Sequence, residues 1–432
     1  MAAGRRTPRA FHVMSKPTGA ICNLDCEYCF FLSKDELYPG SGFRMEPEVH
    51  EAYVSQLLAA QRGNPEVVFA FQGGEPTMMG LDFFRTTLEL QKQYAEPGQG
   101  VLNTLQTNAT LIDDTWAEFL AEHHFLVGVS IDGPAPMHNA YRVDKGGKPT
   151  FDRVIRGLET LKRHGVEWNA LTTVNAANGD HGLEVYRFLR DDLGAEFIQL
   201  IPVVERVTAE LLPLAESGWG ERAGHRPLYR QEGDLVTHRT VSGRQYGQFL
   251  VEVFEEWGRH DVGDVFVSMF DTALAHWMGM DQAGLCVHAR TCGEALALEH
   301  NGDVYSCDHY VEPGYLLGNI TDGRTLLQIV DSPQQRAFGT DKRDSLPAYC
   351  RSCDVRFACN GGCPKDRFLT TPDGEPGLHY LCEGYQRFFR HVDEPMRLMA
   401  GLLRQGQDAT GLRHWYAAQD AARKAAGRPG HA

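Results

Sequence analysis

The chain has 432 residues, too many for one ordinary hydrophobic core, and so we expect two or three domains. Hydrophobic residues make up 42% and charged residues 23% of the sequence, which describes a soluble globular protein, and no apolar run is long enough to span a membrane. The formal net charge is −15 without a long basic run, which argues against nucleic acid as the main partner, because phosphate binding needs clustered Lys and Arg.

The two ends of the chain and its cysteines suggest where the protein works. Residues 1–10 contain three arginines but lead into no apolar segment, so we predict a disordered arm and not a signal peptide. Residues 386–432 predict a C-terminal helix and a tail that frays from Ala417. The eleven cysteines are odd in number and closely clustered, which favours metal binding over a disulfide framework. We therefore expect a cytoplasmic protein that has no membrane as a partner.

Strand-like and helix-like segments alternate in the first half of the chain. Apolar runs predict six strands, at 11–16, 66–71, 102–107, 125–131, 167–174 and 197–204. Amphipathic spacing predicts helices at 81–94, 113–123, 151–164 and 181–192. Such alternation predicts a parallel sheet with right-handed crossovers, either doubly wound or in an open barrel. In both folds, ligands bind at the carboxyl ends of the strands.

The composition changes twice in the second half. Residues 206–243 are rich in Gly, Pro, Arg and Glu and predict a lid-like excursion from a domain at 11–244. Helical spacing then predicts a linker at 245–285. Short segments, turn residues and eight cysteines predict a small domain at 286–385 that is held by metal more than by a large core.

The most informative stretch is Cys22-Asn-Leu-Asp-Cys26-Glu-Tyr-Cys29, which follows the first predicted strand. Close-set thiols in a long intracellular chain usually bind metal. Three thiolates can hold three irons of a four-iron cluster and leave the fourth iron without a protein ligand. Buried structural cysteines and part of a zinc site are the alternatives.

The three cysteines, with Tyr28 before the last of them, resemble the signature of the radical S-adenosylmethionine superfamily. The resemblance implies that S-adenosylmethionine binds the open iron of a [4Fe–4S] cluster and is cleaved to a 5′-deoxyadenosyl radical. It also implies a partial (β/α)6 barrel rather than a doubly wound sheet.

A second motif, Gln-Gly-Gly-Glu-Pro, follows the second predicted strand, where glycines permit the close approach of a ligand. Similarity to the superfamily implies that Gly73, Gly74 and Glu75 bind the methionine amino group. Similarity to sulfatase-maturating enzymes assigns four more residues to the cofactor or substrate: Gln72, Gln106, Ser130 and Arg142. The first two would face the substrate or the methionine moiety, and the last two the methionine carboxylate.

Structural roles are the alternatives at these positions. Strand-end hydrogen bonds and surface ion pairs are common among polar residues in loops. Asn108 and Asp132, which follow the third and fourth predicted strands, could simply cap turns.

Eight more cysteines lie in the carboxyl-terminal part. A zinc ribbon explains their spacing nearly as well as a cluster site, because C-x2-C pairs also bind zinc. The pattern resembles the SPASM domain, which carries two auxiliary [4Fe–4S] clusters, and so the resemblance implies three clusters in all. It assigns the inner auxiliary cluster to Cys286, Cys292, Cys307 and Cys363. It assigns the outer one to Cys350, Cys353, Cys359 and Cys382.

Within this group the chain resembles the anaerobic sulfatase-maturating enzymes from about residue 11 to about residue 399. Those enzymes oxidise a Cys or Ser of a sulfatase precursor to Cα-formylglycine, after the radical has taken a hydrogen from Cβ. One departure is Phe31, where the resemblance leads us to expect a tyrosine.

The reaction also needs a base for the thiol or hydroxyl proton. Asp308, beside Cys307, is the catalytic candidate, and His309 ranks second. A carboxylate with a pKa of about 4 is a poor base for a thiol with a pKa of about 8.5, so burial must raise the pKa of Asp308 or electron loss must drive the transfer. The alternative is that Asp308 caps a turn.

The resemblance implies a peptide or protein substrate and an electron donor such as flavodoxin or ferredoxin. A maturase that crosslinks or oxidises a ribosomally made peptide is the rival enzyme, because fold does not fix function. A non-catalytic electron-transfer or zinc scaffold is the rival outside catalysis, and it would not cleave S-adenosylmethionine.

Overall fold

The expected alternation of strands and helices forms a partial (β/α)6 barrel in the computed structural model, which describes residues 10–224, 227–280 and 284–426. Its six parallel strands are β1 (His12–Lys16), β2 (Glu66–Phe71), β3 (Gly100–Thr107), β4 (Leu126–Ser130), β5 (Trp168–Val174) and β6 (Phe197–Pro202). Each lies where the sequence predicts a strand. The expected disordered arm lies outside the described residues except for residue 10.

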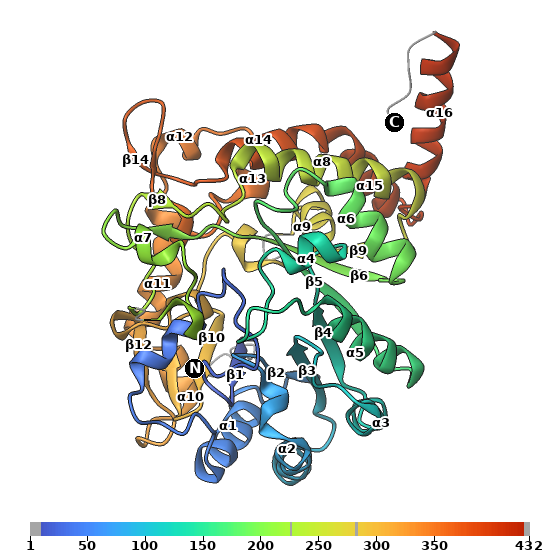
Figure 1. Cartoon of the computed structure of the whole chain (residues 1–432). Helices are drawn as coiled ribbons and strands as arrows, with labels where there is room; N and C mark the ends of the chain where they lie inside the picture. Colours follow the sequence, from blue (N-terminus) through green and yellow to red (C-terminus); the bar gives the residue numbers. More distant parts are fainter. Residues whose placement is uncertain (1–9, 225–226, 281–283, 427–432) are drawn as a thin grey trace, which may run out of the picture.

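The sheet extends beyond the barrel at both edges (Figure 1). β9 (Phe266–Val267) pairs in parallel with β6, and β10 (Ala295–Glu299) pairs in parallel with β1. β11 (Asp303–Tyr305) and β12 (Leu316–Asn319) then continue antiparallel, which gives the order β12-β11-β10-β1-β2-β3-β4-β5-β6-β9. Three strands of the cysteine-rich part thus continue the barrel sheet, and the expectation that metal holds this part more than a large core stays a prediction.

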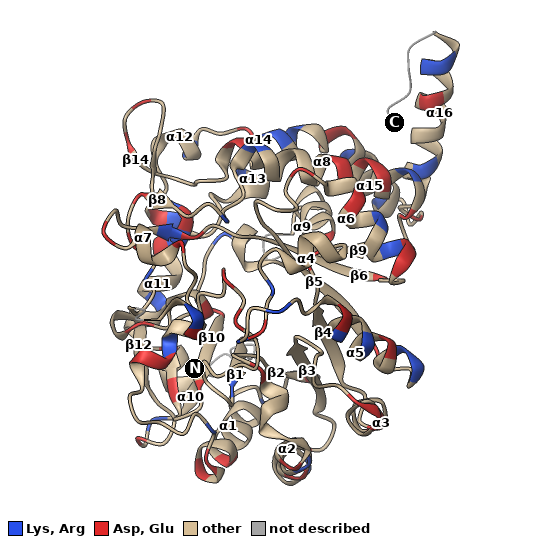
Figure 2. Cartoon of the chain, viewed as in Figure 1, with Lys and Arg blue, Asp and Glu red and all other residues tan. Residues whose placement is uncertain are grey.

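Helices cover the outer face of the barrel strands (Figure 1). They are α1 (Pro47–Ala60), α2 (Leu81–Tyr94), α3 (Asp114–Glu122), α4 (Ala135–Asn139), α5 (Phe151–Arg163) and α6 (Gly182–Arg187), which continues into a π-helical turn (Phe188–Asp192). Only α1 and the short α4 have no counterpart among the predicted helices. The large apolar residues of α1 do form one buried face, which consists of Val49, Tyr53, Val54, Leu57 and Leu58. Figure 2 shows acidic and basic positions intermixed along α5.

Aromatic side chains fix α1 and α2 on the sheet. The Tyr53 ring of α1 meets the Phe69 ring of β2 edge to face, with centroids 5.4 Å apart. Phe71 of the same strand meets Phe84 of α2 at 5.3 Å. All four side chains are buried. Burying one such side chain contributes about 1.5–3 kcal/mol, so these contacts anchor the layer that carries the strand ends.

Within 206–243, the described residues 206–224 and 227–243 form a packed excursion. It contains β7 (Arg206–Val207), α7 (Leu212–Ala215) and β8 (Leu235–Val236). Trp219 and Tyr229 are buried in its own small core, which Phe30 of the cysteine loop also contacts. The Arg222 amide donates to Asp25 Oδ2 at 2.9 Å, so the excursion lies against the loop that carries Cys22, Cys26 and Cys29.

The remaining elements pack over the barrel and at its β1 edge. They are α8 (Gly243–His260), α9 (Ser268–Trp277), α10 (Leu326–Val330), α11 (Pro333–Asp344), α12 (Ala348–Arg351), α13 (Arg356–Cys359), β13 (Leu369–Thr370), β14 (Pro376–Leu378), α14 (Cys382–His391), α15 (Asp393–Arg404) and α16 (Gly411–Ala425). Of the tail expected to fray from Ala417, residues 417–425 belong to α16, which projects from the body of the molecule (Figure 1), and residues 427–432 lie outside the described part of the chain. No helix in the described ranges is long and apolar enough to cross a membrane.

Candidate active site and metal centres

The cysteine loop after β1 brings three free thiols together. Cys26 is buried, and Cys22 and Cys29 are partly buried. Burial raises the pKa of all three thiols, that of Cys26 to about 12. The Leu24 amide donates to Cys22 Sγ at 3.4 Å, and Asn108 Nδ2 donates to the same sulfur at 3.7 Å. Donors of this kind stabilise the thiolate, which is the form that binds iron.

The glycine motif after β2 lies directly on the cysteine loop. The Gly74 amide donates to the Gly19 carbonyl at 2.8 Å, and the Glu75 amide donates to the Ile21 carbonyl at 2.9 Å. A Cβ on Gly74 would lie 1.9 Å from the Ile21 oxygen, and Gly73 has a φ of +117°. The two glycines are thus required for contact between the motifs, because a side chain would separate them.

The Glu75 carboxylate ties the end of β2 to the end of β3. Oε1 accepts hydrogen bonds from the Thr77 amide at 3.1 Å and from the Thr107 hydroxyl at 2.8 Å, and Oε2 accepts one from the Asn108 amide at 2.8 Å. Burial raises the pKa of Glu75, and these donors offset only part of that rise. Glu75 therefore has a structural role whether or not it also contacts a cofactor.

Arg142 forms a buried network with Asp132 and Tyr28. Arg142 Nε and Nη2 donate to the two oxygens of Asp132 at 2.9 and 3.0 Å, and the Tyr28 hydroxyl donates to Asp132 Oδ2 at 2.5 Å. Burial favours a higher pKa for Asp132, but the Arg142 guanidinium together with His138 and the Tyr28 hydroxyl lowers that pKa. The turn-cap alternative for Asp132 is wrong, since this carboxylate joins the cysteine loop to the segment after β4.

The other polar residues expected at the strand ends lie beside this network. Gln106 Nε2 on β3 donates to the Ser130 hydroxyl on β4 at 3.0 Å. Gln72 follows β2 and is partly buried, and its backbone amide donates to the Ser15 carbonyl at 2.8 Å. The side chains that the sequence assigns to one edge are therefore carried by neighbouring strands.

Asp308, the expected base, forms an ion pair with Lys16, the last residue of β1. Lys16 is buried, and its Nζ lies 3.8 Å from the centroid of the Phe31 ring. Burial favours a higher pKa for Asp308, but the Lys16 ammonium and His309 together lower it. The sequence suggests that burial could raise the pKa of Asp308 enough to make it a good base. The net pKa of Asp308 is lowered instead, because the ion pair with Lys16 favours the carboxylate.

His309, the second candidate base, is neutral near pH 7. Burial lowers its pKa to about 4, and its ring lies 5.4 Å from that of Phe30. Its neighbour Asp308 partly opposes that shift.

The eight carboxyl-terminal thiols are free and fall into two sets, within which they raise one another's pKa after the larger effect of burial. The first set is Cys286, Cys292, Cys307 and Cys363. Within it, Cys307 interacts with Cys286 and with Cys363, and Cys292 interacts with Cys286. The second set is Cys350, Cys353, Cys359 and Cys382. Within it, Cys359 and Cys382 interact with each other and with the other two thiols. Gln386 Nε2 donates to Cys382 Sγ at 3.6 Å.

The donor chemistry fits iron–sulfur clusters. Soft thiolates are the ligands that such clusters take, and the thiols occur as one set of three and two sets of four. Within the described part of the chain, no three His, Cys, Asp or Glu side chains are close enough together to hold a single metal ion.

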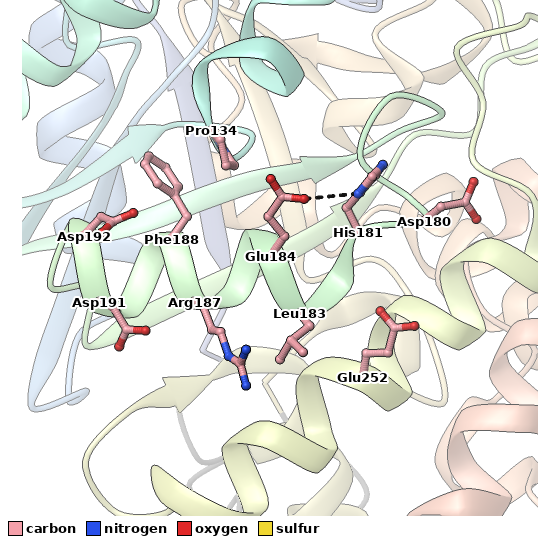
Figure 3. Close-up of a pocket in the computed structure, with 10 residues that line it drawn as sticks. All are labelled: Pro134, Asp180, His181, Leu183, Glu184, Arg187, Phe188, Asp191, Asp192 and Glu252. Carbon is pink, nitrogen blue, oxygen red and sulfur yellow. Dashed lines mark ion pairs between the residues drawn. The ribbon is translucent and has the colours of Figure 1, made fainter. Parts of the chain in front are cut away.

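A surface pocket of about 620 Å³ lies elsewhere, between α6 and α8 (Figure 3). His181 Nδ1 and Glu184 Oε2 lie 3.2 Å apart at its wall. Its lining contains none of the residues that the sequence assigns to the cofactors. The pocket therefore does not belong to the candidate site.

Two contacts of the site escape the sequence motifs. Lys16 ends the first strand, and the same rule that selects polar strand ends could have selected it. Asn108 does form the expected turn, since its Oδ1 accepts from the Thr110 amide at 3.0 Å, but its Nδ2 also reaches the Cys22 sulfur. That second contact depends on the tertiary fold.

Two family models match parts of this chain. Residues 17–189 match the model of the radical SAM superfamily, and residues 286–354 match that of an iron-sulfur cluster-binding domain, SPASM. Over 397 residues the chain is 45% identical to a serine-type anaerobic sulfatase-maturating enzyme of Bacteroides thetaiotaomicron. The matched region covers 90% of this chain and 91% of that protein.

Cysteine-type relatives are similar over much of the same length. A cysteine-type anaerobic sulfatase-maturating enzyme of Clostridium perfringens is 33% identical over 384 residues, 88% of this chain and 95% of that protein. The solved structure of native anSMEcpe with bound AdoMet and Cp18Cys peptide matches with a TM-score of 0.76 and 31% identity, over 91% of this chain and 99% of that one.

Proposed function

Since this chain belongs to the anaerobic sulfatase-maturating enzymes, radical S-adenosylmethionine oxidoreductases that convert a Cys or Ser residue to formylglycine, we propose how its own residues carry out that reaction. Its cofactors are S-adenosylmethionine and three [4Fe–4S] clusters. When bound, they supply the radical that takes a hydrogen from the substrate Cβ and accept the second electron.

The first cluster is assigned to Cys22, Cys26 and Cys29, with one iron left for S-adenosylmethionine. The inner auxiliary cluster is assigned to Cys286, Cys292, Cys307 and Cys363. The outer one is assigned to Cys350, Cys353, Cys359 and Cys382. The grouping of the free thiols into these same three sets supports the assignment.

S-adenosylmethionine would bind where the cysteine loop meets the strand ends. Gln72, Gly73 and Gly74 would border its methionine part, while Glu75 fixes their loop to β3. Gln106 and Ser130 would present polar groups from the neighbouring strands. Arg142 would act mainly through Asp132 and Tyr28, because its guanidinium is already bonded to that carboxylate.

Asp308 would accept the proton of the substrate thiol or hydroxyl group. The ion pair with Lys16 is the observation that carries this assignment, because it keeps Asp308 in the carboxylate form that can take up a proton. The same ion pair makes Asp308 a weak base. Loss of the electron from the substrate must therefore acidify the proton before it moves.

The substrate would be a peptide segment of a sulfatase precursor, as the names of the relatives and a peptide-bound structure suggest. The reductant would be a small electron carrier such as flavodoxin or ferredoxin, in the cytoplasm. Neither nucleic acid nor a membrane has a part in this scheme.

The test uses anaerobically reconstituted protein, S-adenosylmethionine, a reductant and Cys-x-Pro-x-Arg and Ser-x-Pro-x-Arg peptides, followed by mass spectrometry. The aldehyde should form on one peptide or both. Asp308→Asn should lower its yield by about 100-fold or more while S-adenosylmethionine is still cleaved. Asp373→Asn, at an exposed loop position, is the matched control and should have no effect.

Cleavage of S-adenosylmethionine with both peptides left unchanged would point instead to a maturase of a ribosomally made peptide. Full aldehyde yield from Asp308→Asn would remove the base assignment alone.

A further inference from the structure

The inner set of four thiols has a buried cation beside it. Lys342, on α11, is fully buried, and its Nζ donates to the carbonyls of Cys286 at 2.7 Å and Val287 at 3.0 Å. Among the described residues, no carboxylate forms an ion pair with it. The ionisable groups of opposite charge that interact with it are the thiols of Cys292, Cys363 and Cys286 in their thiolate form.

A buried ammonium without a counter-charge is costly, so something must offset the charge of Lys342. Two carbonyl oxygens solvate it but carry no net charge. The negative partner would be the inner set of thiols, which bind iron as thiolates.

One face of α11 organises this set. Gln335 Nε2 donates to the carbonyls of Gly293 and Ser306, each at 3.1 Å, beside Cys292 and Cys307. One turn later, the Gly339 carbonyl accepts from the Cys292 amide at 3.0 Å.

Lys342 lies three residues beyond Gly339 on α11. A Cβ on Gly339 would lie 2.7 Å from the Cys292 oxygen, so the helix can approach the set only at a glycine. Lys342 follows three residues later on the same face, where i and i+3 side chains are neighbours. The backbone contacts of α11 thus hold the Lys342 ammonium beside the inner set of four thiols.

A second buried cation behaves differently. Arg367 interacts with thiols of both sets, Cys350 and Cys359 as well as Cys363 and Cys292. It also donates to backbone carbonyls, among them that of Gly361 at 2.8 Å. Arg367 is shared between the sets, whereas Lys342 acts on the inner set.

We propose that Lys342 is a positioning residue for electron transfer, which raises the reduction potential of the inner auxiliary cluster and not that of the outer one. The inference rests on the proposed assignment of this cluster to Cys286, Cys292, Cys307 and Cys363. One-electron reduction adds a negative charge to the cluster, and a fixed positive charge beside it stabilises the reduced form. Charge and hydrogen bonding near a cluster are known determinants of its potential.

The experiment is an EPR-monitored redox titration of the full chain. In a background with Cys22→Ala, Cys26→Ala and Cys29→Ala, only the two auxiliary clusters contribute. Lys342→Gln, which keeps a donor but removes the charge, should shift one of the two couples to lower potential. We expect a change of about tenfold in its oxidised-to-reduced ratio, or about 59 mV for one electron. Arg343→Gln removes a charge from the exposed side of the same helix and should shift neither couple.

Unchanged couples in an iron-replete Lys342→Gln protein would overturn the proposal. If Lys342→Gln loses iron, Lys342→Arg is the deciding variant, because it keeps the charge. Restored iron content and reduction potential in Lys342→Arg would support the role of the charge. Continued loss of iron would overturn the proposal, because the site would then need the shape of the lysine side chain. The iron content and spectrum of the parent protein test the proposed ligand sets separately from these shifts.

Discussion

Gly74 is the residue at which the two cofactor motifs touch. Its amide bonds to Gly19, and a Cβ would overlap the Ile21 oxygen at 1.9 Å, so Gly74→Ala must push the cysteine loop away. We expect the variant to lose about a third of the bound iron, the share of one cluster in three, and to lose cleavage of S-adenosylmethionine. Iron and sulfide analysis measures this. Gly42→Ala, where nothing lies within 4 Å of the new Cβ, should keep its iron.

His50 gives the fold a dependence on pH that is separate from the clusters. It stacks on Phe83 at 4.1 Å and bonds to the Thr87 hydroxyl at 2.8 Å, and burial lowers its pKa to about 4. The unfolded chain therefore binds a proton at His50 more readily than the folded chain. The stabilisation is complete above the unfolded pKa of about 6.5 and is lost as the pH falls toward about 4.

We expect His50 to contribute about 1.4 kcal/mol to the fall in the free energy of unfolding between about pH 7.5 and about pH 5.5. Urea unfolding of wild type and His50→Gln at both pH values isolates this share, since the other buried histidines contribute equally to both proteins. Identical pH dependence in the two proteins would contradict the account.

At this scale the sequence predicts the positions of the thiols and glycines, because their spacing is local. It does not predict the ion pair of Lys16 with Asp308, which joins the end of β1 to the segment after β11. The lowered pKa of Asp308 could not be foreseen for the same reason. Its cause is a residue from the other half of the chain.

Among the elements, the crossing of α8 and α14 joins the linker region to the last cysteine. Gly384 of α14 lies on Gly243 and Gly247 of α8, and a Cβ on Gly384 would meet the Gly243 oxygen at 2.2 Å. We expect Gly384→Ala to lower the free energy of unfolding by about 1–3 kcal/mol through overpacking. Because Cys382 begins α14, the outer cluster should also bind less iron.

Gly401→Ala on α15 is the matched control, since its Cβ would meet nothing within 4 Å. It should be neutral or slightly stabilising, because alanine favours helix. Equal effects of the two substitutions on denaturant unfolding and on iron content would show that helix propensity matters and the crossing does not.

Local periodicity predicts the barrel strands and α2 well, since each has a continuous apolar run or stripe. It does not predict that β10 pairs with β1, with His12 opposite Ala295, because register across such a distance is a property of the whole fold. It also misses that α16 continues through residues 417–425, where alanines favour helix and Arg259 Nε of α8 donates to Asp420 Oδ2 at 3.1 Å.

For the molecule as a whole, the shared sheet is the central structural fact. The barrel supplies Lys16 from β1, and the cysteine-rich part supplies Asp308 just after β11, so the proposed base depends on both. The excursion at 206–243 contacts the cysteine loop through Asp25, and its Arg206 Nη1 donates to the Lys365 carbonyl of the cysteine-rich part at 3.1 Å. The cofactor site and the proposed base are therefore held in one continuous framework.

The most direct measurement follows a target peptide that carries deuterium at Cβ of its Cys or Ser. The account predicts that deuterium appears in 5′-deoxyadenosine in step with aldehyde formation, and that Asp308→Asn lowers the aldehyde yield. Aldehyde formed without transfer of deuterium, or 5′-deoxyadenosine formed from iron-replete protein with no deuterium and no change in either peptide, would contradict the proposed oxidation.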